Sequence, residues 1–292
     1  MDRNPMDITA VGRARHQGSH SVAKSTDMIE FARELPGRVS RRLSRIVPFR
    51  PTRLRLDRPV VSFTFDDFPL SAAEAAAPAL EDAGMRGTFY YAGGLAGRLE
   101  NGQEIAGPDV AADLFSRGHE IGAHTHMHID VHRTSNGVIL SDLALNKREI
   151  IQLTGGCAPT SFAYPFGRLD LRSKFLLRNE FTSLRGIQTG VNAGVADLAH
   201  LKAQELYDCS STVDSMSRLL DRIERRPGWI IFYTHDVKAN PTDIGCSPTY
   251  FRKIVELVRR RGLTVETVRD AYGRVTGQGA DTQARADEPE GG

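Results

Sequence analysis

The chain has 292 residues, of which 40% are hydrophobic and 25% are charged, and its formal net charge is +2. This composition is typical of a globular protein with a substantial core, and it excludes both a largely disordered chain and a strongly cationic one, so no nucleic-acid partner is expected. No run of about 18 apolar residues occurs, and the first 30 residues lack the apolar segment of a secretory signal. A cytoplasmic protein without a transmembrane helix is therefore predicted.

The charge is uneven along the chain, because residues 1–58 contain 13 Lys and Arg against 6 Asp and Glu. We interpret residues 1–57 as a basic, partly disordered N-terminal arm, with short basic amphipathic helices in 28–48. Packing of this arm on the following domain is favoured, and contact of the arm with an anionic membrane surface or with nucleic acid is the less favoured alternative. The three cysteines, Cys157, Cys209 and Cys246, have no CxxC spacing, which predicts free thiols.

From residue 59 the pattern becomes regular. Short apolar runs predict strands, and apolar residues three and four apart predict helices. The predicted strands are 60–65, 88–91, 120–123, 161–164, 182–187, 229–233 and 263–268. The predicted helices are 71–84, 110–117, 140–153, 169–178, 211–225 and 248–261. One domain over 58–272 and a disordered polar tail over 273–292 are expected.

The predicted strands are continuous apolar runs rather than alternating ones, which indicates a sheet covered on both faces. Together with the alternation of strands and helices, this predicts a parallel α/β architecture, either a barrel or a doubly wound sheet. In both, functional side chains gather at the carboxyl ends of the strands.

Four of these strand ends carry polar side chains or a sharp turn. They are the Asp66–Asp67 pair, the histidine-rich segment 124–128, the turn 164–167, and His235 with Asp236. Two adjacent carboxylates after a buried strand cannot both be core residues, because a buried, unpaired carboxylate is costly. They are expected to face a cleft, a cation or solvent.

The histidines favour a cation. His124 and His128 are four residues apart and share one face if the segment makes a helical turn. With one carboxylate of the 66–67 pair they would supply three ligands and leave a position open, as in a catalytic metal site. His126 would point away from that face, and His132 is an additional candidate ligand. The remaining carboxylate is suited to act as a general base.

His235 lies at a different strand end from these histidines. From there it is suited to protonate a leaving group. The alternative is a surface histidine neutralised by Asp236.

These segments resemble the polysaccharide deacetylases of the NodB-homology type, carbohydrate esterase family 4. Residues 64–67 resemble the first motif of that family, 124–128 match its H-[S/T]-x-x-H motif, 162–167 resemble the third motif, and 229–235 resemble the strand with the last catalytic histidine. The resemblance spans roughly residues 58–270. It implies a distorted (β/α) barrel, a divalent metal, commonly zinc, and hydrolysis of N-acetyl, sometimes O-acetyl, groups on sugars.

The resemblance also implies roles for individual residues. Asp66 would be the general base and His235 the general acid. The metal would be held by Asp67, His124 and His128. The backbone N–H of Phe166 would help to stabilise the oxyanion. Substrate contacts are expected from Tyr164, Pro165 and Trp229.

Two features depart from the family pattern. The arginine that orients the base in the third motif is Ala163 here, with Arg185 as a candidate replacement and Arg168 as a weaker one. The acid of the fourth motif is not recognisable, and only Asp208 and Asp214 are candidates.

The predicted function is that of a metal-dependent hydrolase that removes acetyl groups from a sugar, an oligosaccharide or a lipid-linked glycan. One alternative is a cytoplasmic hydrolase of another amide or a cyclic imide on the same fold. The other is a catalytically inactive sugar-binding or scaffold protein, against which the presence of both Asp66 and His235 argues.

Overall fold

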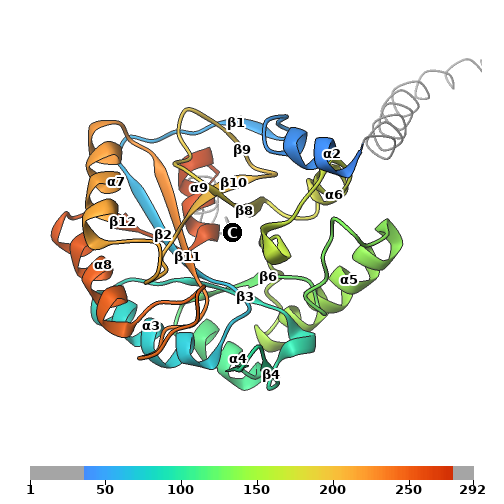
Figure 1. The fold of residues 1–292 in the computed structure, drawn as a ribbon, viewed down its shortest axis with the longest axis horizontal. Coiled ribbons are helices and arrows are strands. Elements are labelled where there is room, and N and C mark those ends of the chain that lie inside the picture. The colour runs from blue at the N-terminus through green and yellow to red at the C-terminus, as the bar shows by residue number, and fades with distance from the viewer. Residues whose placement is uncertain (1–35, 279–292) are drawn as a thin grey trace, which may run out of the picture.

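Within residues 36–278, the part of the chain that the computed structural model describes, seven parallel strands form a closed barrel (Figure 1). In their order around the barrel they are β2 (Val60–Phe65), β3 (Thr88–Tyr91), β6 (Glu120–Ala123), β7 (Ser161–Ala163), β8 (Ser183–Thr189), β10 (Leu201–Glu205) and β11 (Trp229–Thr234). Strand β11 closes the barrel by pairing with β2 along its whole length. The expected (β/α) barrel is confirmed, and the doubly wound alternative is excluded.

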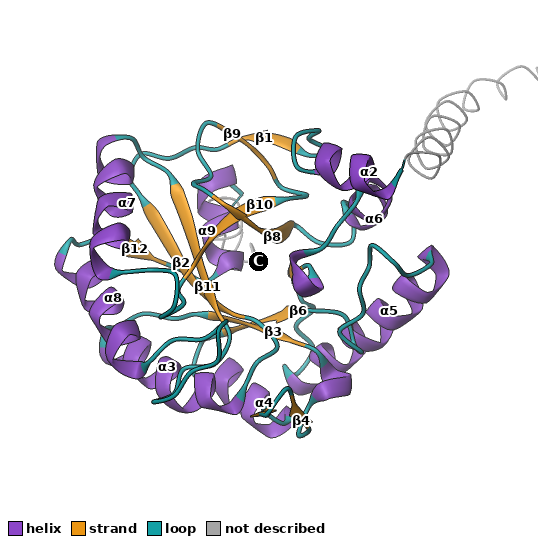
Figure 2. Ribbon diagram, in the orientation of Figure 1, coloured by secondary structure: helices purple, strands orange, loops and turns teal. Residues whose placement is uncertain are grey.

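Helices cover the outside of this barrel (Figure 2). They are α3 (Leu70–Asp82), α4 (Pro108–Ser116), α5 (Asn136–Leu153), α6 (Leu171–Leu177), α7 (Val213–Arg225) and α8 (Pro248–Arg260). Each overlaps a predicted helix, and each returns the chain to the other end of the barrel, which a parallel strand order requires. No helix in residues 36–278 has both the length and the apolar composition to cross a membrane.

Strand β2 illustrates why the sequences of the strands are continuous apolar runs. Its Phe63 and Phe65 pack outward, each with its ring centroid 5.7 Å from that of Phe251 on α8. Its Val60 belongs to a second apolar cluster, together with Trp229 at the start of β11. Because apolar groups lie on both sides of the strand, the residues that point inward and those that point outward are all buried.

The carboxyl-terminal end of the domain differs from the expectation. Strand β12 (Thr264–Val265) is only two residues long and pairs with the start of β2. Helix α9 (Val268–Thr276) follows, and its first two backbone N–H groups donate to Thr88 Oγ1 and Glu120 Oε2, both at 2.9 Å, at the amino ends of two strands. The prediction of a strand over 263–268 is therefore mostly wrong. The predicted tail cannot begin at residue 273, because Val275 is fully buried.

Several short strands had no signal in the sequence. They are β10, the antiparallel pair β1 (Pro51–Arg53) and β9 (Val195–Asp197), and the hairpin β4 (Leu99–Glu100) and β5 (Gln103–Glu104). Apart from β10 they are only two or three residues long, and β10 alternates apolar and polar residues without a flanking turn signal. Strands of this kind depend on their partners more than on their own residues.

The described part of the N-terminal arm packs on the barrel. Helix α2 (Gly37–Ser44) lies beside α6 in Figure 1, and β1 pairs with β9. The side chain of Lys174 on α6 is 1% exposed, and its Nζ donates to the carbonyls of Ser44 and Val47 at 2.6 and 2.7 Å and pairs with Asp197 at 2.6 Å. Residues 1–35 of the predicted arm lie outside the described residues, and membrane contact stays a prediction.

We expect Lys174→Met to lower the free energy of unfolding by about 3 kcal/mol, because a largely buried carboxylate and two carbonyls lose their shared donor. Loss of this anchor should also speed proteolytic cleavage within residues 45–58. Chemical denaturation and limited proteolysis would measure the two effects. Lys253→Met on the exposed side of α8 is the matched control, and equal behaviour of the two variants would show that the anchor contributes nothing.

Candidate active site at the carboxyl ends of the barrel strands

An open pocket lies at the carboxyl end of the barrel and holds about 800 Å³ of space, part of it open to solvent. It is lined by residues that follow three different strands: Asp66, Asp67, His124, His128 and His235. The remaining lining residues are Asn101, Phe166, Gly167, Arg168, Ile187, Tyr207, Tyr233 and Ile244. The parallel strand order thus brings the polar strand ends of the sequence to one place.

Asp67, His124 and His128 form a cluster with the geometry of a metal site. Asp67 Oδ1 lies 3.2 Å from His124 Nε2 and 3.0 Å from His128 Nε2. Ligands of a tetrahedral zinc ion lie about 3.3 Å apart, so these separations leave a common point at bonding distance. Asp67 Oδ1 is buried and has no hydrogen-bond partner among residues 36–278. A buried carboxylate oxygen of this kind needs a cation, so the three side chains fit a divalent metal.

The contacts behind His124 support this fit. Its Nδ1–H donates to the carbonyl of Ala163 at 2.8 Å, which leaves the lone pair of Nε2 directed at Asp67. Burial opposes ionisation of Asp67, but the two imidazoles outweigh it and hold the pKa of Asp67 well below its ordinary range. The carboxylate is therefore ionised and available as a ligand.

The segment 124–128 is a tight loop, so the helical turn that would have placed His124 and His128 on one face does not form. Thr125 and His128 have positive φ angles of 60° and 49°, so the loop folds back and both imidazoles reach Asp67. Positive φ is uncommon for residues other than glycine, and it recurs at Asp67 and Phe166 in the same pocket (φ 59° for both). Backbone strain of this kind often marks a functional site.

Two residues that the sequence did not single out hold this loop. Asp142 accepts hydrogen bonds from the backbone N–H groups of His126 and Met127, at 2.6 and 3.1 Å. Asn146, one helical turn further along α5, accepts from the backbone N–H of His124 at 3.2 Å. Both are polar residues at a spacing of four on the otherwise apolar buried face of α5, and this pattern could have identified them.

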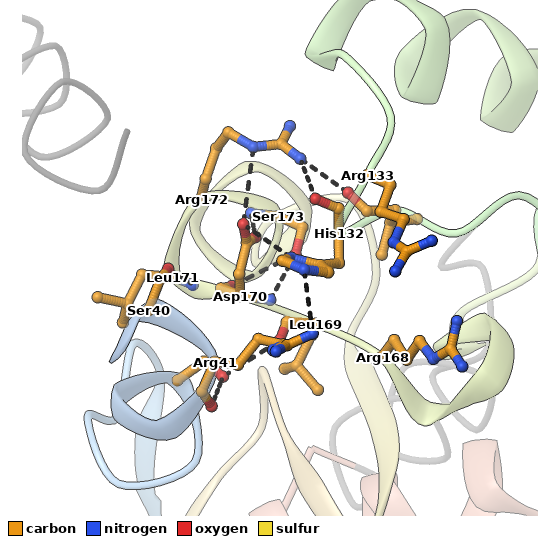
Figure 3. A network of polar contacts seen from close by, with 12 residues as sticks. Ser40, Arg41, His132, Arg133, Arg168, Leu169, Asp170, Leu171, Arg172 and Ser173 are labelled. Atoms are coloured by element: carbon orange, nitrogen blue, oxygen red, sulfur yellow. Dashed lines mark hydrogen bonds and ion pairs between the residues drawn. The ribbon is translucent and has the colours of Figure 1, made fainter. Parts of the chain in front are cut away.

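The other two histidines near this loop do not belong to the cluster. His126 Nδ1 pairs with Glu149 at 3.1 Å, in agreement with its exclusion as a ligand. The ring of His132 lies between Asp170 and Arg41, at 3.4 Å from each, and Figure 3 shows it there. The prediction of His132 as an additional ligand is therefore wrong, because its ring contacts the arm on one side and the start of α6 on the other.

Asp66 is 4% exposed, and its partner is Arg185 on β8. A side-chain N–H of Arg185 donates to Asp66 Oδ1, and the guanidinium lies between the rings of Tyr90 and Tyr233, at 5.0 and 5.2 Å from their centroids. Ala163 on β7 is the register partner of Arg185. The guanidinium thus enters the barrel from the strand next to the one that carries arginine in the family motif.

This partner controls the charge of Asp66. Burial alone would raise the pKa of Asp66, but attraction to Arg185, with contributions from His124 and His235, holds that pKa below its ordinary value. Asp66 is therefore ionised at neutral pH. The weaker candidate, Arg168, instead pairs with Asp130 at 3.1 Å and does not contact Asp66.

His235 faces the same pocket from β11. Its Nε2 lies 4.0 Å from Asp67 Oδ2, and its Nδ1–H donates to the carbonyl of Ile244 at 3.1 Å. Neither candidate for the fourth-motif acid reaches it: Asp208 accepts from the N–H of Ser247, and Asp214 is exposed in the first turn of α7. The reading of His235 as a surface residue neutralised by Asp236 is also wrong, because the carboxylate of Asp236 is bonded elsewhere.

Phe166 lies in the short 3-10 turn η2 (Pro165–Gly167) at the edge of the pocket. Its side chain is half exposed, and its ring centroid is 4.3 Å from that of His128. The three substrate contacts expected from Tyr164, Pro165 and Trp229 are not found. Tyr164 and Pro165 are buried and do not line the pocket, and the hydroxyl of Tyr164 donates to the carbonyl of Ala199 at 3.0 Å.

Trp229 is the third of these corrections. It opens β11 at the amino end of the barrel, opposite the pocket, where it pairs with Val60. Its side chain is fully buried, and its Nε1–H donates to Ser62 Oγ at 3.0 Å. Trp229 is a core residue, because the first residue of a parallel strand lies far from the carboxyl end at which the pocket forms.

Comparisons with known proteins agree with this geometry. Residues 53–180 match the family model described as polysaccharide deacetylase. A chitin deacetylase of Colletotrichum lindemuthianum is 27% identical over 127 residues, which cover 43% of this chain and 50% of that protein. A chitin deacetylase of Arthroderma benhamiae is 20% identical over 216 residues, which cover 73% of this chain and 52% of that protein. The chain thus spans about half the length of the curated relatives it matches.

The solved structure of the chitin deacetylase from Colletotrichum lindemuthianum shares the fold. Its TM-score is 0.55 at 18% identity, and the match covers 77% of this chain and 92% of that structure. At such low identity the likeness concerns the fold alone. Together the two comparisons support one statement: residues 53–180 are similar in sequence to the polysaccharide deacetylase family, and the barrel shares the fold of a chitin deacetylase.

Proposed function

We propose that this protein is a metal-dependent deacetylase that hydrolyses acetyl groups, in particular N-acetyl groups, on a carbohydrate. The observation that carries the proposal is the convergence of the Asp67, His124 and His128 cluster with a separate Asp66–Arg185 pair and with His235 in one pocket. The relatives that match the chain are named chitin deacetylases, which favours an acetylated glycan as the substrate class.

The proposed metal ion is zinc, held by Asp67, His124 and His128. Two imidazole nitrogens and one carboxylate oxygen are a donor set that zinc accepts in catalytic sites, with a further position left open. A divalent metal bound there would supply Lewis-acid chemistry, which activates water and polarises a carbonyl.

The protein's own residues would carry the proton transfers. Asp66, ionised beside Arg185, accepts the proton of the water whose oxygen attacks the acetyl carbon. The backbone N–H of Phe166 stabilises the negative charge that develops on the carbonyl oxygen. His235, on another strand end, donates a proton to the nitrogen as the carbon–nitrogen bond breaks. The products are acetate and an amino sugar.

The test is acetate release from a panel of N- and O-acetylated sugars and oligosaccharides, with the metal content measured on the same sample. About one metal ion per chain together with acetate release would support the proposal. A bound metal without acetate would favour another amide or a cyclic imide as the substrate, and sugar binding without any turnover would favour the inactive binding protein. Absence of metal binding after reloading would contradict the proposed site.

We expect His128→Ala to lose the metal and the activity together, because one of three ligands is removed. Metal content after dialysis and acetate release would be measured in parallel. His126→Ala is the matched control: this neighbouring histidine pairs with Glu149, so the variant should keep its metal. Retention of the metal by His128→Ala would remove His128 from the ligand set.

A further inference from the structure

The loop that follows β11 folds around the buried carboxylate of Asp236. This side chain is fully buried, and it accepts hydrogen bonds from both the backbone N–H and the hydroxyl of Thr242, at 2.9 and 2.6 Å. The ammonium group of Lys238 lies 3.4 Å from the same carboxylate. Because charge-assisted hydrogen bonds are strong, Asp236 holds the two halves of the loop together.

The returning half of the loop is packed tightly against Asp236. The backbone N–H of Cys246 donates to the carbonyl of Asp236 at 2.9 Å. A Cβ atom at Gly245 would lie 2.1 Å from Asp236 Oδ1, so no other residue fits there without displacing the carboxylate. The position of residue 244 is therefore set by the contacts on either side of it.

Ile244 presents its carbonyl to His235. The oxygen accepts from the backbone N–H of His235 at 3.2 Å and from its ring Nδ1–H at 3.1 Å. In the part of the chain that the structure describes, no carboxylate contacts Nδ1 of His235. A backbone carbonyl therefore fixes the ring orientation and tautomer, so that Nε2 faces the pocket.

We propose that Asp236 is a positioning residue for catalysis: by clamping Thr242 it holds the Ile244 carbonyl against His235 and so aims the ring that protonates the leaving group. This inference rests on the proposed function. It also accounts for the missing acid of the fourth motif, because the task of orienting His235 passes to a backbone carbonyl that is itself held by a buried carboxylate.

The test compares two substrates that differ in their need for an acid. An N-acetylated sugar releases an amine that must be protonated, whereas 4-nitrophenyl acetate releases a phenolate that leaves without a proton. Thr242→Val removes the hydroxyl that bonds Asp236 and should lower kcat on the acetylated sugar at least about tenfold, with KM unchanged. Turnover of 4-nitrophenyl acetate should change less than about twofold.

Matched variants separate positioning from general damage. Thr242→Ser keeps the hydroxyl and should behave as the wild type. Asp236→Asn should reproduce the selective loss, whereas Asp243→Asn, the same change at an exposed acid of the same loop, should have no effect. In a His235→Ala background, Thr242→Val should add no further loss, because both changes act through one ring.

Four results would overturn the inference. Equal losses on both substrates would mean that Thr242 supports the fold of the pocket and not the acid. A further loss in the His235→Ala background would mean that it acts elsewhere. An active wild type with an unimpaired Thr242→Val variant would refute the clamp while leaving the proposed function intact, whereas a wild type inactive on both substrates would refute both.

Discussion

Asp66→Asn should keep the bound metal and lose acetate release by a factor of about 10² to 10⁴, the usual contribution of a general base. The amide cannot accept the proton of the attacking water, but Asp66 is not one of the three clustered ligands. Metal content and initial rates on the same preparation would measure both effects. Because Arg185 loses its counter-charge in this variant, thermal unfolding must show that the protein is folded at the assay temperature.

The neighbouring residue provides the contrast. Asp67→Asn, the same chemical change one residue further on, should lose both metal and activity, because Asp67 Oδ1 faces the two imidazoles. If the Asp66→Asn variant kept its activity, another residue would have to be the general base. Loss of metal from Asp66→Asn would place this carboxylate among the ligands.

Removal of the Arg185 guanidinium should have the largest effect on stability. Arg185→Met leaves the carboxylate of Asp66 buried without a counter-charge, which typically costs about 3–5 kcal/mol. Chemical denaturation would measure the free energy of unfolding. The double variant Asp66→Asn with Arg185→Met should recover most of this loss, because neither charge remains, but it should stay inactive. An Arg185→Met variant as stable as the wild type would show that the pair is not coupled.

A second pair of variants tests the position of the guanidinium. Ala163 and Arg185 are register partners on adjacent strands, so an arginine at either position enters the same space. Ala163→Arg alone should be destabilised, because two guanidinium groups would crowd one carboxylate in a closely packed interior. Ala163→Arg combined with Arg185→Ala should recover stability and acetate release. A fully active Ala163→Arg single variant would count against Arg185 as the partner of the base.

Local signals in the sequence sufficed for much of the fold. The strands β2, β3, β6 and β11 are short apolar runs, and the helices between them have clear apolar spacing, so their residues alone indicate a parallel α/β protein. Family motifs then distinguished the barrel from the doubly wound sheet. Asp66 and His124 were found because each directly follows a buried strand, and the ends of parallel strands meet on one side of the molecule.

Contacts between distant segments had to be read from the tertiary structure. Arg185 could be distinguished from Arg168 only by the register of β7 and β8. Trp229 was expected to contact the substrate, and His132 was an additional candidate ligand. Trp229 instead starts a strand at the far end of the barrel, and the ring of His132 contacts Asp170 at the start of α6.

The orientation of the proposed acid, His235, likewise depends on contacts between segments that are apart in the sequence. The sequence by itself determined which residue types stand at the strand ends, because that information is local. The partner of His235 is a backbone carbonyl, which every residue carries and no motif reveals. Only the fold of the loop around Asp236 brings the carbonyl of Ile244 to that ring, so this part of the site was decided by tertiary structure.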